Sequence, residues 1–97
     1  MERLLGVKDR KGRDVYLTKE RWSHISMEHP EVSSYVNEFE TVLNKPTKIV
    51  EYTHDKSVCY YYKHFKSRKD KPAFLLIIVK YLNGEGFIIT AYFVRKI

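Results

Sequence analysis

Residues 74–82 read Phe-Leu-Leu-Ile-Ile-Val-Lys-Tyr-Leu, residues 83–86 read Asn-Gly-Glu-Gly, and residues 87–95 read Phe-Ile-Ile-Thr-Ala-Tyr-Phe-Val-Arg. Both apolar runs are rich in β-branched and aromatic residues, and the short link between them contains two glycines. This pattern predicts an antiparallel hairpin. The first run is apolar at odd and even positions alike, so we expect a central strand with both faces covered, for which the rest of the chain must supply neighbours.

Alternation along the second run predicts which side chains share a face of the sheet. One face is expected to carry Ile88, Thr90, Tyr92 and Val94, and the other Phe87, Ile89, Ala91, Phe93 and Arg95. The hydroxyl groups of Thr90 and Tyr92 are therefore expected on the same side of an otherwise apolar strand.

The residues before this hairpin predict a smaller hairpin and two helices. Residues 4–17 contain two short apolar runs around turn-prone residues 8–13, which indicates a small hairpin. Thr18 is placed to cap a helix over residues 19–28, and Pro30 ends that helix because proline disfavours helical geometry at the residue before it. A second helix is predicted from residue 30 or 31, where apolar residues recur at helical spacing, to Asn44-Lys45-Pro46.

After Pro46 the pattern changes to strands, over residues 47–52 and 58–65, and a basic loop over residues 66–72 leads into the C-terminal hairpin. We therefore predict an α+β fold, in which an N-terminal short hairpin is followed by two consecutive helices packed on a four-stranded antiparallel meander. The length fits a single domain over residues 1–97. The helices would cover one face of the meander and leave the other partly open for a substrate.

The charge of the chain indicates a polyanionic partner. Lys and Arg number 18 against 12 Asp and Glu, a net charge of +6, which favours nucleic acid first and an anionic membrane second, with an ordinary solvated basic surface as the alternative. The single cysteine, Cys59, cannot form an intramolecular disulfide, and no signal peptide or membrane-spanning run is evident. We expect a cytoplasmic protein without a membrane partner.

Cleavage of RNA without a metal needs a base for the 2′-hydroxyl proton, a cation or donor at the phosphoryl oxygens, and an acid for the leaving oxygen. Histidine suits both proton transfers because its unperturbed pKa is about 6.5. The chain offers imidazoles at His24, His29 and His64, hydroxyls at Tyr60, Tyr62, Thr90 and Tyr92, and cations at Lys63, Lys66, Arg68, Lys69, Lys71 and Lys80.

Each of these residues also has an ordinary structural interpretation. His29 would cap the first helix at the edge of the core, His24 would lie on the surface, and His64 would face solvent at a strand end. Thr90 and Tyr92 would satisfy each other in a half-buried sheet face, and the loop cations would be solvated. Lys80 is the strongest functional candidate among the lysines because it is the sole charge in a long apolar strand.

The sequence predicts no metal site and no cofactor. His24 and His29 are five residues apart, about 140° around a helix, so they cannot both bind one metal ion as the HExxH pair does. There is no CxxC motif and no glycine-rich phosphate loop, and Cys59 lies in an apolar strand that would raise the pKa of its thiol and disfavour a nucleophilic role.

Four motifs carry a resemblance to a known family: residues 16–25, Tyr-Leu-Thr-Lys-Glu-Arg-Trp-Ser-His-Ile; residues 28–31, Glu-His-Pro-Glu; residues 44–46, Asn-Lys-Pro; and residues 89–93, Ile-Thr-Ala-Tyr-Phe. They resemble small phage and prokaryotic proteins of the nuclease superfamily named after barnase, EndoU, the tRNase colicins and RelE. The resemblance covers residues 14–95 and implies a fold with helices first and a four-stranded antiparallel meander after them.

The resemblance implies that His24 and His29 from the helical segment and Thr90 and Tyr92 from the last strand form the site. Lys80 and Arg68 are added from the chemistry above, because the last strand carries no basic residue before Arg95. RNA is the implied partner. An antitoxin or immunity protein is left open as a further partner, and the oligomeric state is not set by the sequence.

Two hypotheses follow. The first is a metal-independent, toxin-like endoribonuclease, in which His24 or His29 act as base and acid, Thr90 and Tyr92 orient the phosphate, and Lys80 with Arg68 supplies positive charge. The residues expected to bind the substrate are Arg68, Lys66, Lys69, Tyr60, Tyr62 and His64. The second is a non-catalytic module that binds RNA or a partner protein on the same basic face, with bases stacked on Tyr60 and Tyr62.

Overall fold

The centre of the sheet is the predicted C-terminal hairpin, strands β5 (Phe74–Leu82) and β6 (Glu85–Val94), in a computed structural model that describes residues 2–97. Its turn is Asn83-Gly84, and both residues have positive φ angles, 54° and 82°. Asn-Gly favours this backbone, whose twist matches that of the strands it joins. The two strands pair along their whole length, from Phe74 opposite Val94 to Leu82 opposite Glu85.

The predicted α+β arrangement, two consecutive helices on a four-stranded antiparallel meander, is wrong. The sheet has six strands in the order β1-β2-β6-β5-β4-β3. The outer members are β1 (Arg3–Lys8), β2 (Asp14–Thr18), β3 (Lys48–Glu51) and β4 (Val58–His64). Strands β3 to β6 pair antiparallel in chain order, but β2 joins β6 in parallel, which makes the sheet mixed. The N-terminal hairpin is thus part of the sheet.

Gly86 is the residue that lets β2 approach β6. It pairs with Val15, and a Cβ atom at Gly86 would lie 2.8 Å from the ring of Tyr81 and from Val79 Cγ1, and 3.0 Å from Val15 Cγ2. Val15 and Val79 are fully buried in the packed core, so their side chains cannot move aside to make room for it. The parallel pairing therefore depends on a residue without a side chain.

We expect Gly86→Ala to lower the free energy of unfolding by about 1–3 kcal/mol, because the added methyl group overpacks the contact between β2 and β6. Urea denaturation followed by circular dichroism measures the change. Gly6→Ala is the matched control, since a Cβ there meets only the ring of Tyr16, at 3.2 Å, and that ring is partly exposed. Equal stability of the two variants would contradict the close-packing argument.

The helical segment has three parts. Helix α1 (Lys19–Glu28) begins as predicted, with the Thr18 hydroxyl accepting the Arg21 N–H at 3.1 Å. The second predicted helix is corrected: Pro30–Glu38 forms a 3₁₀-helix, η1, and only Phe39–Asn44 forms an α-helix, α2. Apolar residues three apart suit both helix types, so the spacing alone did not separate them. None of the helices formed by residues 2–97 is long and apolar enough to cross a membrane.

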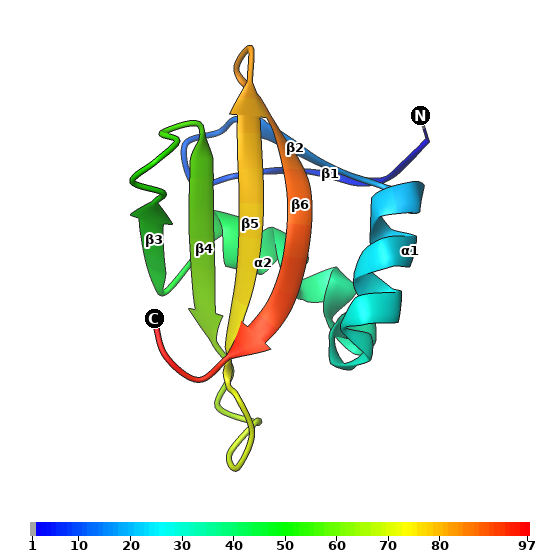
Figure 1. The fold of residues 1–97 in the computed structure, drawn as a ribbon, viewed down its shortest axis with the longest axis vertical. Coiled ribbons are helices and arrows are strands. Elements are labelled where there is room, and N and C mark those ends of the chain that lie inside the picture. Colours follow the sequence, from blue (N-terminus) through cyan, green and yellow to red (C-terminus); the bar gives the residue numbers. More distant parts are fainter. Residues whose placement is uncertain (1) are drawn as a thin grey trace.

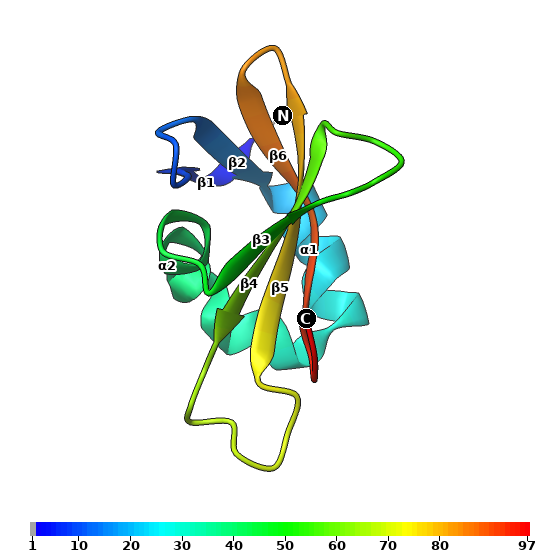
Figure 2. The same ribbon diagram turned by 90° about the vertical axis from the view of Figure 1, so that its left-hand side faces the viewer.

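The sheet has a covered inner face and an outer face that is only partly open, since Tyr62 and Leu76 on the outer face are buried. Tyr61, Ile77 and Ala91 lie opposite one another on β4, β5 and β6, and all three are buried in the core. The neighbouring row, Tyr62, Leu76 and Tyr92, points to the other side. Figures 1 and 2 show α2 and the N-terminal hairpin on the inner side, with α1 beside β6. Within residues 2–97, the two figures show no helix over the outer face.

A bulge in β6 corrects the predicted faces of that strand. The register shifts between Ile78, which is opposite Thr90, and Val79, which is opposite Ile88. Ile88 is therefore buried in the core with Ala91 and Phe93, whereas Thr90 lies on the outer face with Tyr92. Strict alternation placed Ile88 and Thr90 together because one extra residue in a strand leaves no mark in the apolar pattern.

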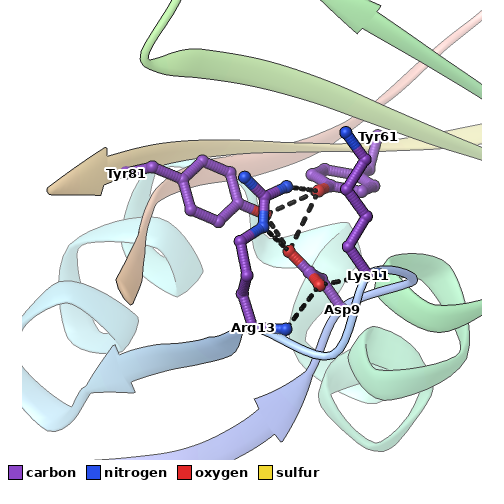
Figure 3. Close-up of polar contacts among 5 residues, drawn as sticks. All are labelled: Asp9, Lys11, Arg13, Tyr61 and Tyr81. Carbon is purple, nitrogen blue, oxygen red and sulfur yellow. Dashed lines mark hydrogen bonds and ion pairs between the residues drawn. The ribbon is translucent and has the colours of Figure 1, made fainter. Parts of the chain in front are cut away.

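The loop between β1 and β2 is held by a buried carboxylate, Asp9 (Figure 3). Its Oδ1 accepts the backbone N–H groups of Lys11 and Arg13 at 2.9 Å each, and its Oδ2 accepts Arg13 Nε at 2.8 Å and the Tyr81 hydroxyl at 2.7 Å. Burial, together with hydrogen bonds to Tyr61 and Asp9, raises the pKa of Tyr81 far above its ordinary value, so the phenol stays protonated and donates. Asp9 thus ties the N-terminal hairpin to β5.

Candidate functional site

The outer face brings together a histidine and a tyrosine of the predicted site. The ring of His29 stacks on the ring of Tyr92, with centroids 4.9 Å apart and planes 24° from parallel. Both side chains are partly exposed. An imidazole and a phenol this close can contact the same phosphodiester group, one for proton transfer and the other for hydrogen bonding.

His29 is fixed because it stands at the junction of two helices. Its N–H donates to the Ile25 carbonyl at 2.7 Å, at the end of α1, and its carbonyl accepts the Val32 N–H at 3.0 Å, at the start of η1. Pro30 prevents the chain from continuing α1. The imidazole is therefore held at a corner of the backbone, beside the edge of β6.

Glu31 is a neighbour of His29 that sequence reasoning missed. Its Oε2 lies 3.9 Å from His29 Nδ1. His29 is partly exposed and Glu31 is exposed, and at this distance the carboxylate lies beside the imidazole without forming a hydrogen bond to it. The signal was present in the motif His29-Pro30-Glu31, where the proline turns the chain so that residues two apart can face each other.

Thr90 lies on the same face, two residues from Tyr92 and opposite Ile78. The strand rise places it roughly 7 Å from Tyr92 along β6. His24, the other predicted catalytic imidazole, is exposed on α1 and stacks neither on Tyr92 nor on His29 among residues 2–97. The structure thus groups His29, Tyr92 and Thr90, and leaves His24 apart from the stacked pair.

Lys80 is not at the His29–Tyr92 pair. Its ammonium group is 2.7 Å from Asp55 Oδ2, and this hydrogen bond, with those from Ser57, lowers the pKa of Asp55 to about 2. Lys80 is four residues along β5 from Leu76, and Leu76 is the residue opposite Tyr92. Four residues of a strand span about 13 Å, so Lys80 is about that far along the sheet from the row of Tyr92. Lys80 instead lines a hollow of about 310 Å³ near the β5–β6 turn, with Arg21, Phe87 and Ile89.

The predicted loop cations also lie elsewhere. The Arg68 guanidinium is 3.7 Å from the ring centre of Phe93, an inner-face residue, and its Nε donates to the Pro72 carbonyl at 2.7 Å. Lys66 and Lys69 are exposed on the same loop, at the far end of β4. Arg68 therefore braces the loop from the core side and does not share the outer face with Tyr92.

Aromatic rings continue across the outer face from β3 to β4. Tyr52 and Tyr60 stack with centroids 5.9 Å apart and planes 6° from parallel, and Tyr60 and Tyr62 are 6.5 Å apart. Tyr62 lies in the same row as Tyr92, with Leu76 between them, and both Tyr62 and Leu76 are buried, so Tyr62 offers little of its ring to a base. His64 packs on Phe74 at 5.0 Å, in the next row. We call Tyr52, Tyr60, Tyr62 and Tyr92 the tyrosine strip.

Two further cations lie in the segment that follows β6. The backbone of this segment, residues 95–97, runs past the lower ends of β5 and β4 on the outer side of the sheet (Figures 1 and 2). It carries Arg95 and Lys96, both exposed. The sequence pattern placed Arg95 in the last strand, on the face with Phe93, whereas β6 ends at Val94 and Arg95 follows it.

Comparison of the chain with known protein families, with curated proteins and with solved structures finds no match. Within residues 2–97 no group of three or more His, Cys, Asp or Glu side chains is placed to hold a metal ion.

Proposed function

We propose that the protein is a metal-independent endoribonuclease that binds single-stranded RNA along the tyrosine strip and cleaves it at the His29–Tyr92 pair. The observation that carries the proposal is the stacking of a partly exposed histidine on a tyrosine, on the face where the exposed Tyr52 and the partly exposed Tyr60 also stack. Every base has a π-face, so such a row binds single strands without strict sequence preference. The net charge of +6 favours their association.

The chemistry follows from the groups at the pair. His29 takes the proton of the ribose 2′-hydroxyl, and the 2′-oxygen attacks phosphorus while the bond to the 5′-oxygen breaks. The leaving oxygen takes a proton from an acid, for which the protonated imidazole or the Tyr92 phenol is available. Tyr92, Thr90 and the cations of residues 95–97 would stabilise the negative charge on the phosphoryl oxygens. The products are a 2′,3′-cyclic phosphate and a free 5′-hydroxyl.

The resemblance of residues 14–95 to the barnase, EndoU, colicin and RelE nucleases supports this function, since His29, Thr90 and Tyr92 are residues it assigns to the site. The competing function is a non-catalytic RNA-binding module. Two observations favour it: the rings are spread along the face, and Lys80 is paired with Asp55 instead of lying beside His29.

The test is incubation of the protein with end-labelled single-stranded RNA in EDTA, with DNA of the same sequence as the matched control. We expect the RNA to be cut to products that end in a 2′,3′-cyclic phosphate and the DNA to stay intact, because it lacks the attacking hydroxyl. Cleavage of both would contradict 2′-hydroxyl attack. Binding of RNA without cleavage would leave the binding module as the function.

Removal of one ring from the tyrosine strip tests the path of the RNA. We expect Tyr60→Ala to weaken RNA binding by about tenfold, since stacking of a base on an aromatic ring contributes roughly 1–3 kcal/mol. Fluorescence anisotropy with a labelled oligonucleotide measures the affinity. Tyr60→Phe retains the ring and should bind RNA as the unaltered protein does. Equal affinities of the Ala and Phe variants would show that the RNA does not bind on this face.

A further inference from the structure

A second site lies on the inner side of the sheet, away from the tyrosine strip. It is a pocket of about 530 Å³ between the β1–β2 loop and strands β3 and β4. Its floor consists of inner-face side chains, among them Ile49, Cys59, Tyr61 and Tyr81, and its walls carry Arg10, Lys11, Arg13, Lys56 and Glu51. The volume falls in the range of small-molecule sites, about 300–1,000 Å³.

The pocket is positively charged. Four cationic side chains line it, opposed by Glu51 and by Asp9 beneath the floor, which leaves a net charge of +2. A phosphate monoester carries about −1.5 to −2 near pH 7, so it would neutralise this excess. Arginine is suited to phosphate because its planar guanidinium offers several N–H donors in a fixed geometry.

Arg13 is held in place before any ligand arrives. Its guanidinium lies 3.8 Å from the ring centre of Tyr81, its Nε donates to Asp9 at 2.8 Å, and its Nη2 lies 3.4 Å from the Tyr61 hydroxyl (Figure 3). Its Nη1 amino group has no hydrogen-bond partner within residues 2–97. Such a fixed donor favours binding because little side-chain freedom remains to be lost.

The loop that carries the other cations is also fixed. Asp9 accepts the N–H groups of Lys11 and Arg13, and the Asp9 N–H donates to the Arg13 carbonyl at 2.9 Å. Gly12, with a φ of 83°, completes the turn. Arg10 and Lys11 are therefore exposed on a closed loop whose backbone is anchored by a buried carboxylate.

We infer that this pocket binds a small molecule with a terminal phosphate monoester attached to a ring, of the size of a nucleoside monophosphate. The phosphate would lie among Arg10, Arg13 and Lys56. The ring would cover Ile49 and Cys59, and Glu51 would accept hydrogen bonds from a sugar hydroxyl or amino group. This inference is independent of the proposed nuclease, because the pocket opens on the inner face and Tyr92 lies on the outer one.

Isothermal titration of the whole protein with adenosine 5′-monophosphate tests the site. We expect binding that weakens with added salt and that is weaker by about tenfold for adenosine, which lacks the phosphate. A 5′-phosphorylated oligonucleotide, titrated in competition, distinguishes a free nucleotide from an RNA end as the source of the phosphate. Equal affinity for adenosine and its monophosphate, or no heat with either, would overturn the inference.

The variant to compare is Arg10→Ala/Lys56→Ala, in which both altered side chains are exposed, so the fold should persist. We expect it to bind the mononucleotide at least about tenfold more weakly. Lys19→Ala/Lys45→Ala removes the same charge from exposed positions outside the pocket and should bind normally. Equal losses of nucleotide affinity in both variants would show that the net charge of the protein, and not this pocket, determines binding. Both variants should cleave RNA at the same rate. A loss of nucleotide binding in the pocket can therefore be told apart from a loss of nuclease activity.

Discussion

His29→Gln is expected to lower the rate of RNA cleavage by about 10²- to 10⁴-fold, the contribution typical of a general acid or base. Glutamine keeps a planar polar group over the Tyr92 ring but cannot transfer a proton at neutral pH. RNA affinity should therefore change little while the single-turnover rate falls. The measurement is cleavage of labelled RNA with the protein in excess, alongside anisotropy for binding.

His24→Gln is the matched control, because His24 is exposed on α1 and stacks neither on His29 nor on a ring of the tyrosine strip among residues 2–97. Its cleavage rate should equal that of the unaltered protein. Tyr92→Phe separates the ring from its hydroxyl: the stack persists, so a fall in rate would assign hydrogen bonding or proton donation to the phenol. If His29→Gln cleaves as fast as the unaltered protein, His29 has no catalytic role.

Asp9→Ala is expected to lower the free energy of unfolding by about 3 kcal/mol. The carboxylate is fully buried, and its removal leaves Arg13 Nε, the Tyr81 hydroxyl and two backbone N–H groups without their acceptor. Loss of one partner of a buried charged network typically costs 3–5 kcal/mol, and Arg13, whose side chain is 33% exposed, recovers part of this by hydration. Urea denaturation monitored by circular dichroism gives the value.

Asp14→Ala is the control for Asp9→Ala. Asp14 pairs with Lys8 at 2.7 Å, but both side chains are about half exposed, so the midpoint of unfolding should hardly move. A similar loss in the two variants would show that Asp9 acts as an ordinary surface charge and that the network in Figure 3 does not hold the hairpin.

The same carboxylate predicts a pH dependence. Burial opposes ionisation of Asp9, but the hydrogen bonds from Tyr81 and Arg13 outweigh it and hold its pKa below the ordinary value of 3.8. The unfolded chain therefore takes up the proton first as the pH falls, so the stabilisation is complete above about pH 4 and is lost below it. In Asp9→Asn the slope of stability against pH below 4 should be smaller. Asp55, with a pKa of about 2, titrates equally in both proteins.

Much of the local structure could be predicted from the sequence, because local patterns determine it. The 74–95 hairpin, the Thr18 cap and the break at Pro30 follow from propensity, side-chain capping and the geometry of proline. The parallel pairing of β2 with β6 could not be predicted, since it joins Val15 to Gly86 across most of the chain through two residue pairs. The buried Asp9 was missed for a similar reason: its partners on β4 and β5 are far away in sequence.

The candidate site was predictable in part. The resemblance grouped His29 with Tyr92, and the structure has their rings in contact. The cations were harder to predict, because a charge in an apolar strand can be paired by a distant loop, as Asp55 pairs Lys80. Likewise, Arg68 was assigned to the substrate from its charge alone, and its position over Phe93 depends on the direction of a loop.

The order of strands in the sheet has a consequence for synthesis. Strands β1 and β2 are made before β3, β4 and β5, yet the strand that β2 adjoins is β6, which is made after all of them. Val15 and Leu17, which are fully buried in the finished protein, stay exposed to water until residue 86 has emerged. The core can therefore close only after β6 has been made, and nascent chains halted before residue 86 should remain sensitive to protease in their N-terminal hairpin.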